Sequence, residues 1–284
     1  MKKLIRVGLV LMLIGIVSSV VLVSAFKIDM NNILSIGNRS PFINIGNEKN
    51  DKTIYEEYDS FGNLSIDVDL GEVIIEEGDK FTVKIDYCSK CKYSFEVKKE
   101  GNTLDIVGSK KGNWVFNMNN SSPVIKVTVP AGNSINDLDV NSDLGIVKIT
   151  GLNINKLELD ASMGDVVVNN NIINEASIDA KMGSVKVASD INEVDISVSM
   201  GELVFKGKTS KIDVSNSMGA TTLEIKGVKD DYKIKVKSSM GSINVDGQKD
   251  EGINNSLELN QNMNLDNSID VDNSMGEVDI RFVQ

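Results

Sequence analysis

The chain has 284 residues, of which 41% are apolar and 25% charged, and it contains no histidine. This length is enough to bury one sizeable core, while the lack of histidine removes the commonest general base and the commonest neutral metal ligand. The formal charge of −11 makes the body repel phosphate backbones, so we expect no nucleic-acid partner.

Residues 1–26 form a separate segment. A basic start, MKKLIR, precedes 19 uncharged residues at 7–25, which is just long enough to cross a bilayer as a helix. The preceding cations predict a cytoplasmic N-terminus and an exported remainder. We therefore expect a single-pass protein of the cell membrane, held by an uncleaved anchor, with an extracytoplasmic β-domain. The alternative is a signal segment cleaved after Val23-Ser24-Ala25, which would give a secreted protein.

Residues 27–52 are polar and rich in Asn and Ser, as expected of a stalk. From residue 53 onward, apolar and polar residues alternate. The stretch LSIDVDLGEVIIEE at 64–77 places apolar side chains on every second residue, which is typical of a half-buried strand. Short turn segments separate similar runs up to residue 130, and no helical period appears after residue 26. The sequence predicts one all-β domain over 53–284, with hairpins in its N-terminal part.

A corner glycine recurs within this domain, preceded by Met or Leu. The interval is 18 or 19 residues between Gly145 and Gly219, and each glycine stands before a short apolar run. A period near 20 residues indicates stacked structural repeats. We predict a parallel β-solenoid with coils of roughly 18–22 residues; an antiparallel β-sandwich is the alternative. The predicted corners are Gly71, Gly145, Gly164, Gly183, Gly201, Gly219, Gly241 and Gly276.

The phase of each repeat predicts how its side chains point. Apolar residues lie seven and five positions before each glycine and two and four positions after it. The step from the first set to the second is an odd number of residues, which on a flat strand would place the two sets on opposite faces, so the chain must bend or bulge between them. Glycine tolerates the backbone conformation that such a bend requires. We expect the Met before each glycine to point inward and to stack on the Met of the next coil. The serine before that Met, as in Ser199-Met200, should face water. We also expect the C-terminal unit, 269–284, to cover one open end of the stack.

The stretches IKVTVPAGNSINDLDVNSDLGIVKITG at 125–151 and LSIDVDLGEVIIEEGD at 64–79 carry a family resemblance. Together with the serial x-G-x-V units, they resemble the bacterial putative-adhesin domains with β-strand repeats, a domain of unknown function that includes LiaG-like cell-envelope proteins. The resemblance covers about 53–284. It implies an exported, often membrane-anchored β-solenoid with adhesive or envelope-stress roles, and it brings no catalytic residues.

Cys88 and Cys91 lie in the sequence C-S-K-C between two expected strands. The pair could form a disulfide, act as a redox couple or supply half of a zinc site. A zinc site is disfavoured because the sequence has no further Cys and no His to complete it. Redox activity is disfavoured because no helix N-terminus, which would lower the pKa of a thiol, is apparent here. We favour a structural disulfide, which exported proteins can form.

No other residue set indicates a reaction or a cofactor. Thioethers are soft ligands that could bind Cu(I), but a buried methionine stack is more simply explained as core. Aspartates near the corners lack the regular loop motif of calcium-binding solenoids. We therefore expect no catalytic, cofactor or metal site. The favoured function is a non-enzymatic adhesion, binding or scaffolding surface for an unknown envelope ligand. An accessory or sensor of envelope stress, with a membrane protein partner, is the alternative, and a carbohydrate-active enzyme is the weakest hypothesis.

Overall fold

The computed structural model describes residues 49–110, 121–260 and 264–283. The expected anchor at 1–26 and nearly all of the expected stalk at 27–52 lie outside these residues. Within them, no helix is long and apolar enough to cross a membrane. The described residues form strands and two short 3-10 turns, so the all-β prediction is confirmed for this part of the chain.

The strands follow one another from Lys52 to Val283, and several run through a bend without a break. They are β1 (Lys52–Tyr58), β2 (Asn63–Val68), β3 (Gly71–Gly78), β4 (Phe81–Tyr87), β5 (Tyr93–Glu100), β6 (Thr103–Lys110), β7 (Val124–Pro130), β8 (Ser134–Thr150), β9 (Asn153–Gly207), β10 (Lys211–Asn216), β11 (Thr221–Lys226), β12 (Tyr232–Val245), β13 (Gln248–Leu259) and β14 (Asn267–Val283); the 3-10 turns are η2 (Ser89–Cys91) and η3 (Lys229–Asp231).

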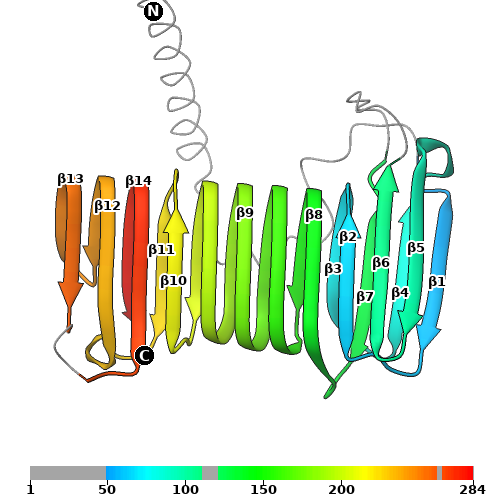
Figure 1. Cartoon of the computed structure of the whole chain (residues 1–284), viewed down its shortest axis with the longest axis horizontal. Helices are drawn as coiled ribbons and strands as arrows, with labels where there is room; N and C mark the ends of the chain where they lie inside the picture. Colours follow the sequence, from blue (N-terminus) through cyan, green and yellow to red (C-terminus); the bar gives the residue numbers. More distant parts are fainter. Residues whose placement is uncertain (1–48, 111–120, 261–263, 284) are drawn as a thin grey trace, which may run out of the picture. The chain divides into compact units, whose positions relative to one another are not determined.

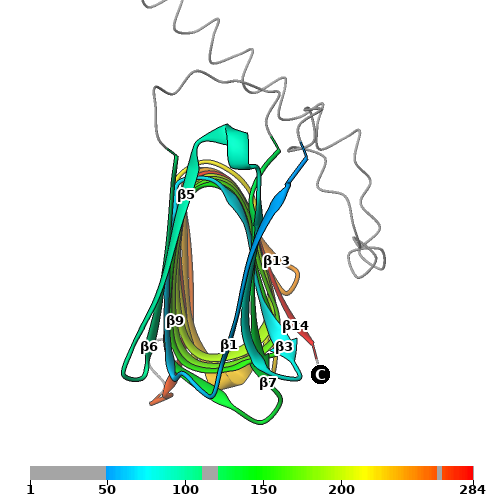
Figure 2. The same ribbon diagram turned by 90° about the vertical axis from the view of Figure 1, so that its right-hand side faces the viewer.

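Successive coils pair in parallel and in register. β8 aligns with β9 so that Leu138 faces Leu157 and Gly145 faces Gly164, and β2 and β3 align with β8 in the same way. Figure 1 shows these strands standing side by side, and Figure 2, which looks along the stack, shows the two walls joined by bends. This is the arrangement of a parallel β-solenoid, and the sandwich alternative is wrong for the repeats.

Antiparallel pairing occurs near the two ends of the stack. At the N-terminal end β5 and β6 form one of the expected hairpins, whereas β1 pairs with β4 and β4 with β7, which are antiparallel pairs of non-consecutive strands. At the other end β13 folds back antiparallel along β12, from Ile234 to Val245. Such hairpins cover the end coils, whose strand edges would otherwise be open to pairing with another chain.

The core fills the space between the two walls. Each coil contributes inward side chains from both of its strands, such as Leu157 and Leu159 before the corner and Val166 and Val168 after it, all at most 2% exposed. Complete burial of such a side chain contributes about 1.5–3 kcal/mol, so every added coil extends one continuous apolar column. The same alternation that identified the strands therefore also stabilises the stack.

Buried polar groups hold the bends opposite the corner glycines. The Asn171 side chain is 2% exposed, accepts a hydrogen bond from the Leu152 backbone N–H and donates to the carbonyl oxygens of Ile149 and Asn169, at 2.9 to 3.0 Å. These bonds satisfy backbone groups that leave the strand ladder at the bend.

The order of the last coils differs from our expectation. The C-terminal strand β14 lies between β10 and β12 and pairs in parallel with both, while β13 occupies the end of the sheet. The expectation that 269–284 covers an open end is therefore wrong. The units share one apolar phase, so each fits equally well against any neighbour, and the phase alone could not give their order.

Candidate functional site

The corner glycines form one column along the stack. At Gly164 φ is +140°, and a Cβ on this residue would lie 1.6 Å from the carbonyl oxygen of Gly145 in the preceding coil. Only glycine fits, because the bend needs this φ and the coils approach closely. By these close approaches the column runs in the order Gly71, Gly145, Gly164, Gly183, Gly201, Gly219, Gly276 and Gly241.

The methionines before these glycines face outward, so the prediction of an inward column is wrong. Met200 is 44% exposed and Met240 49%, whereas the residue two positions earlier than each Met is buried, as Val198 is at 2%. Alternation thus continues inward to the third residue before the glycine, and the chain then bends. The inside of the bend is narrow and takes small side chains such as Ala161 and Ala180, and the methionines lie on its convex side.

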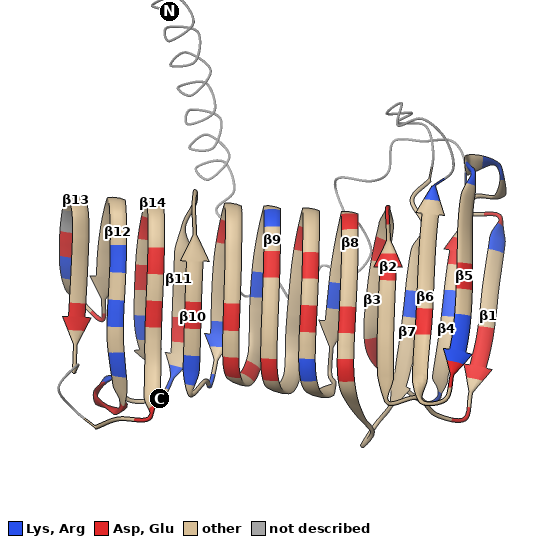
Figure 3. Cartoon of the chain, viewed as in Figure 1, with Lys and Arg blue, Asp and Glu red and all other residues tan. Residues whose placement is uncertain are grey.

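Carboxylates gather on the outer face of the strands that precede the corners, which we call the acidic face. Asp195, Asp213 and Asp270 occupy equivalent positions on three adjacent strands. Burial raises the pKa of Asp213, and the carboxylates of Asp270 and Asp195 raise it further. The pKa of Asp139 is raised by burial and by its carboxylate neighbours in the same way. Figure 3 shows these acidic bands recurring from coil to coil.

The opposite outer face carries charges that are largely paired across strands. Lys148 bonds Glu72 at 2.7 Å, and Lys206 bonds Glu224 at 2.9 Å. Because these half-buried pairs neutralise each other, that face carries no comparable excess of negative charge. The two faces therefore differ in charge although they share one backbone architecture.

An open groove of about 220 Å³ crosses the acidic face where the outward side chains are small. Ser177 occupies the place that Glu158 and Asp195 take on neighbouring coils. The groove is lined by Lys156, Leu157, Glu175, Ala176, Ser177, Glu193, Val194, Asp195, Lys211 and Asp213. A concave, mainly acidic surface of this kind suits a cationic group. Within the described residues, no cluster of three Cys, Asp or Glu side chains has the geometry of a metal site.

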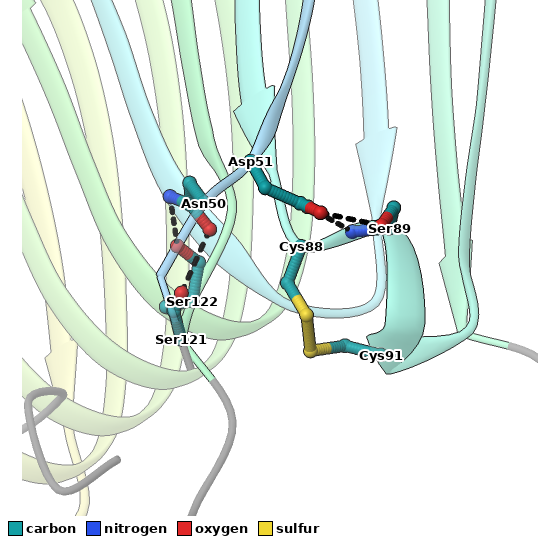
Figure 4. The surroundings of a disulfide bond; sticks show 7 residues. All are labelled: Asn50, Asp51, Cys88, Ser89, Cys91, Ser121 and Ser122. Atoms are coloured by element: carbon teal, nitrogen blue, oxygen red, sulfur yellow. Dashed lines mark hydrogen bonds between the residues drawn. A yellow bond between two sulfur atoms is a disulfide. The ribbon is translucent and has the colours of Figure 1, made fainter. Parts of the chain in front are cut away.

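Cys88 and Cys91 are joined by a disulfide around η2, with their Cα atoms 5.3 Å apart. Both cysteines are at least 95% buried. Asp51 accepts hydrogen bonds from the backbone N–H and the hydroxyl of Ser89, at 2.6 and 2.7 Å, and these bonds lower the pKa of the Asp51 carboxyl (Figure 4). These hydrogen bonds fix the disulfide loop to Asp51, the residue that precedes β1, as expected of a disulfide with a structural role.

Sequence reasoning missed the groove and the imbalance between the two faces. The signal for the imbalance was present: in the strands before the corners, Asp and Glu outnumber Lys among the outward residues from Asp137 to Asp213, where the lysines are Lys156, Lys181 and Lys211. The groove depends on which small residue stands beside which carboxylate, and this needs the order of the coils.

These features define the class of the protein: a parallel β-solenoid with a glycine corner column and one acidic outer face. The sequence profile of the Toastrack DUF4097 domain matches residues 61–219 and, in an overlapping second match, residues 145–281. The chain therefore belongs to the Toastrack DUF4097 family. This confirms the resemblance to putative-adhesin domains of unknown function.

Several solved structures are similar in fold. A putative adhesin from Parabacteroides distasonis is 16% identical, with 81% of this chain and 99% of that chain covered and a TM-score of 0.41. A putative cell adhesion protein from Clostridium sporogenes is 16% identical, with 82% and 99% covered and a TM-score of 0.33. A putative lipid binding protein from P. distasonis is 14% identical, with 83% and 98% covered and a TM-score of 0.33. No curated protein matches the chain. Likenesses this distant do not identify a ligand.

Proposed function

We propose that the chain is a non-enzymatic, membrane-anchored protein of the cell envelope, whose extracytoplasmic solenoid binds a cationic partner through its acidic face. The observation that carries the proposal is the alignment of Asp195 and Asp213 on adjacent strands, where both line the groove. The next carboxylate in this line, Asp270, is paired with Lys235 at 3.3 Å. Parallel pairing repeats such positions about every 4.8 Å along the stack. A line of like charges is unfavourable by itself, and a cationic partner relieves the repulsion.

A binding role also agrees with how the polar side chains are distributed. The same few types, mainly carboxylates, lysines and hydroxyls, recur from coil to coil over the length of the stack. Catalytic groups converge on one reacting atom, whereas a recognition surface benefits from regular spacing on a rigid scaffold. The in-register pairing of the coils supplies that rigidity.

Binding can be tested on the full chain in detergent, with a short oligolysine peptide as the probe. We expect affinity to fall as salt rises, and the triple variant E193Q/D195N/D213N to bind about tenfold more weakly than the wild type. The matched control is E202Q/E224Q/E277Q on the opposite face, which removes the same charge and should change affinity by less than about twofold. Equal losses in both variants would show attraction by net charge alone and would contradict a specific face.

Membrane anchoring rests on the basic start and on the uncharged residues 7–25. We expect fractionation to recover the protein with membranes, and protease added from outside the cell to digest the β-domain. A soluble mature form that begins at Phe26 would instead support signal cleavage and secretion. This outcome would leave the acidic-face proposal standing, since the two tests are independent.

A further inference from the structure

The outward-facing methionines form a continuous line along the corner column, which we call the methionine ridge. In spatial order it consists of Met163, Met182, Met200, Met218, Met275 and Met240, and these are all the methionines among the described residues. Met163, Met182, Met200 and Met240 are between 44% and 49% exposed and Met218 is 40% exposed, whereas Met275 is half-buried. Burial in the core therefore does not explain them.

Adjacency along the ridge follows from backbone contacts. The Gly201 N–H donates to the Met218 carbonyl oxygen, and the Gly219 N–H donates to the Met275 carbonyl oxygen, both at 2.9 Å. Met275 also pairs in register with Met240. Met200, Met218 and Met275 thus occupy three successive coils, with neighbouring backbones about 4.8 Å apart. A methionine side chain has three rotatable bonds, so three thioethers at this spacing can turn toward a common point.

Packing alone gives no reason for sulfur at these positions. Leu70 and Leu144 occupy the same place in the first two coils, so an aliphatic side chain satisfies the corner equally well. Thioether sulfur differs from leucine chiefly as a soft ligand, which favours Cu(I) over harder cations. We propose that Met200, Met218 and Met275 bind one soft monovalent cation of the Cu(I) type through their Sδ atoms.

The surroundings of this triad favour a cation. The outward residues that follow the corner glycines include Glu202 and Glu277 on two of the three coils, while Ser199 precedes Met200. The nearest lysine in sequence to any ridge methionine is Lys181, which precedes Met182 on the coil that adjoins Met200 and is not part of the triad. Carboxylates near a site raise the local concentration of cations.

Apart from its eight other methionines, the sequence offers no imidazole and no free thiol that would compete for a soft ion. The sequence has no histidine, and its two cysteines are joined in a buried disulfide. Binding of a soft monovalent ion to the oxidised protein would therefore report on thioethers. This makes the chain well suited to a direct test with Ag(I), a redox-stable probe for the same ligand chemistry.

The experiment titrates the full, oxidised chain in detergent with silver nitrate in chloride-free buffer, followed by calorimetry and by NMR of the methionine methyl groups. We expect one equivalent to bind, with shifts of the three triad methyl resonances assigned from single Met→Leu variants. The variant M200L/M218L/M275L should bind Ag(I) at least about tenfold more weakly, because leucine keeps the shape but removes the ligand atom. M163L, at the end of the ridge beside Leu144, is the control and should change affinity by less than about twofold.

Two outcomes would overturn the proposal. One is equal Ag(I) affinity in the wild type and the triple variant, and the other is the absence of a triad methyl shift at one equivalent. Leucine already stands at two corners, so the triple variant should fold, and its far-ultraviolet circular dichroism is checked against the wild type. A peptide-binding ridge would instead tolerate all three leucines, which separates this site from a purely apolar contact surface. The result is also independent of the acidic-face proposal, whose variants leave every methionine in place.

Discussion

Replacing Gly201 by alanine tests the close approach of neighbouring coils. At Gly201 φ is +152°, and an added Cβ would lie 1.7 Å from the carbonyl oxygen of Gly183. A non-glycine residue in this backbone region costs about 1–3 kcal/mol. Relief of the contact must also separate two coils and weaken at least two ladder hydrogen bonds, at about 0.5–1.5 kcal/mol each. We therefore expect the G201A variant to lose about 2–6 kcal/mol of unfolding free energy.

Gly101 provides the matched control. It lies in the turn between β5 and β6 with φ of +59°, and no atom lies within 4 Å of the place that its Cβ would take. G101A should therefore cost only the left-handed backbone penalty, about 1–2 kcal/mol.

Urea unfolding of the full chain in detergent, followed by circular dichroism, measures both variants. Hydrogen exchange adds a second readout, because contacts in a stack are mainly between neighbours and lost protection should centre on 183–219. If G201A loses no more stability than G101A, the coils do not approach each other as described, and the reasoning fails.

Three further predictions concern the corner and the acidic face. Met200→Asp should lower the free energy of unfolding by less than about 1 kcal/mol because the side chain faces solvent, whereas Val198→Asp should lower it by more than about 4 kcal/mol because it buries a charge. Equal falls in melting temperature for the two variants would contradict the assigned faces. Asn273 is 0% exposed and its side-chain amide has no hydrogen-bond partner among the described residues, so Asn273→Val should stabilise by about 1–3 kcal/mol, and a fall in melting temperature would argue against it. The folded-state pKa of Asp213 is raised, so its ionisation destabilises the fold as pH rises above the ordinary value. Asp213→Asn should therefore melt higher than the wild type at pH 7 and equally at pH 3; a difference that persists at pH 3 would have another cause.

The periodicity of the glycines was enough to predict the solenoid. Serial glycines at intervals of 18 or 19 residues, each between two alternating runs, fit stacked coils because every coil must bend at the same place. The alternation also predicted the buried positions, such as Leu157 and Val166 on either side of a corner. The glycine spacing and the alternation of apolar residues are local properties of the sequence, so they predict the coils and the buried positions without knowledge of long-range pairing.

The direction of the methionines and the order of the last coils could not be obtained in the same way. At a bend, period-two alternation stops, so it does not assign the residue next to the glycine to either face. The informative signal was two positions before each methionine, where Ala161, Ala180 and Val198 continue the series of inward-facing residues. The chain bends after them, so the methionine faces outward. The position of β14 depends on long-range pairing between units with the same phase. The groove lies on consecutive coils of β9 and β10, and it depends on the sizes of the side chains that stand side by side there.

The internal position of β14 has a consequence for how the protein is made. A chain that emerges from its N-terminus can add coils one by one as far as β11, but β12 and β13 emerge before the strand that separates them from β10. Until residues 267–283 are present, the hairpin of β12 and β13 must therefore either remain unpaired with β10 or pair with it in a non-native way and later dissociate. Synthesis that stops short of these residues leaves a gap within the stack. Residues 267–283 thus act as a completeness check on the β-domain, because the hairpin of β12 and β13 reaches its native neighbour only when they are present.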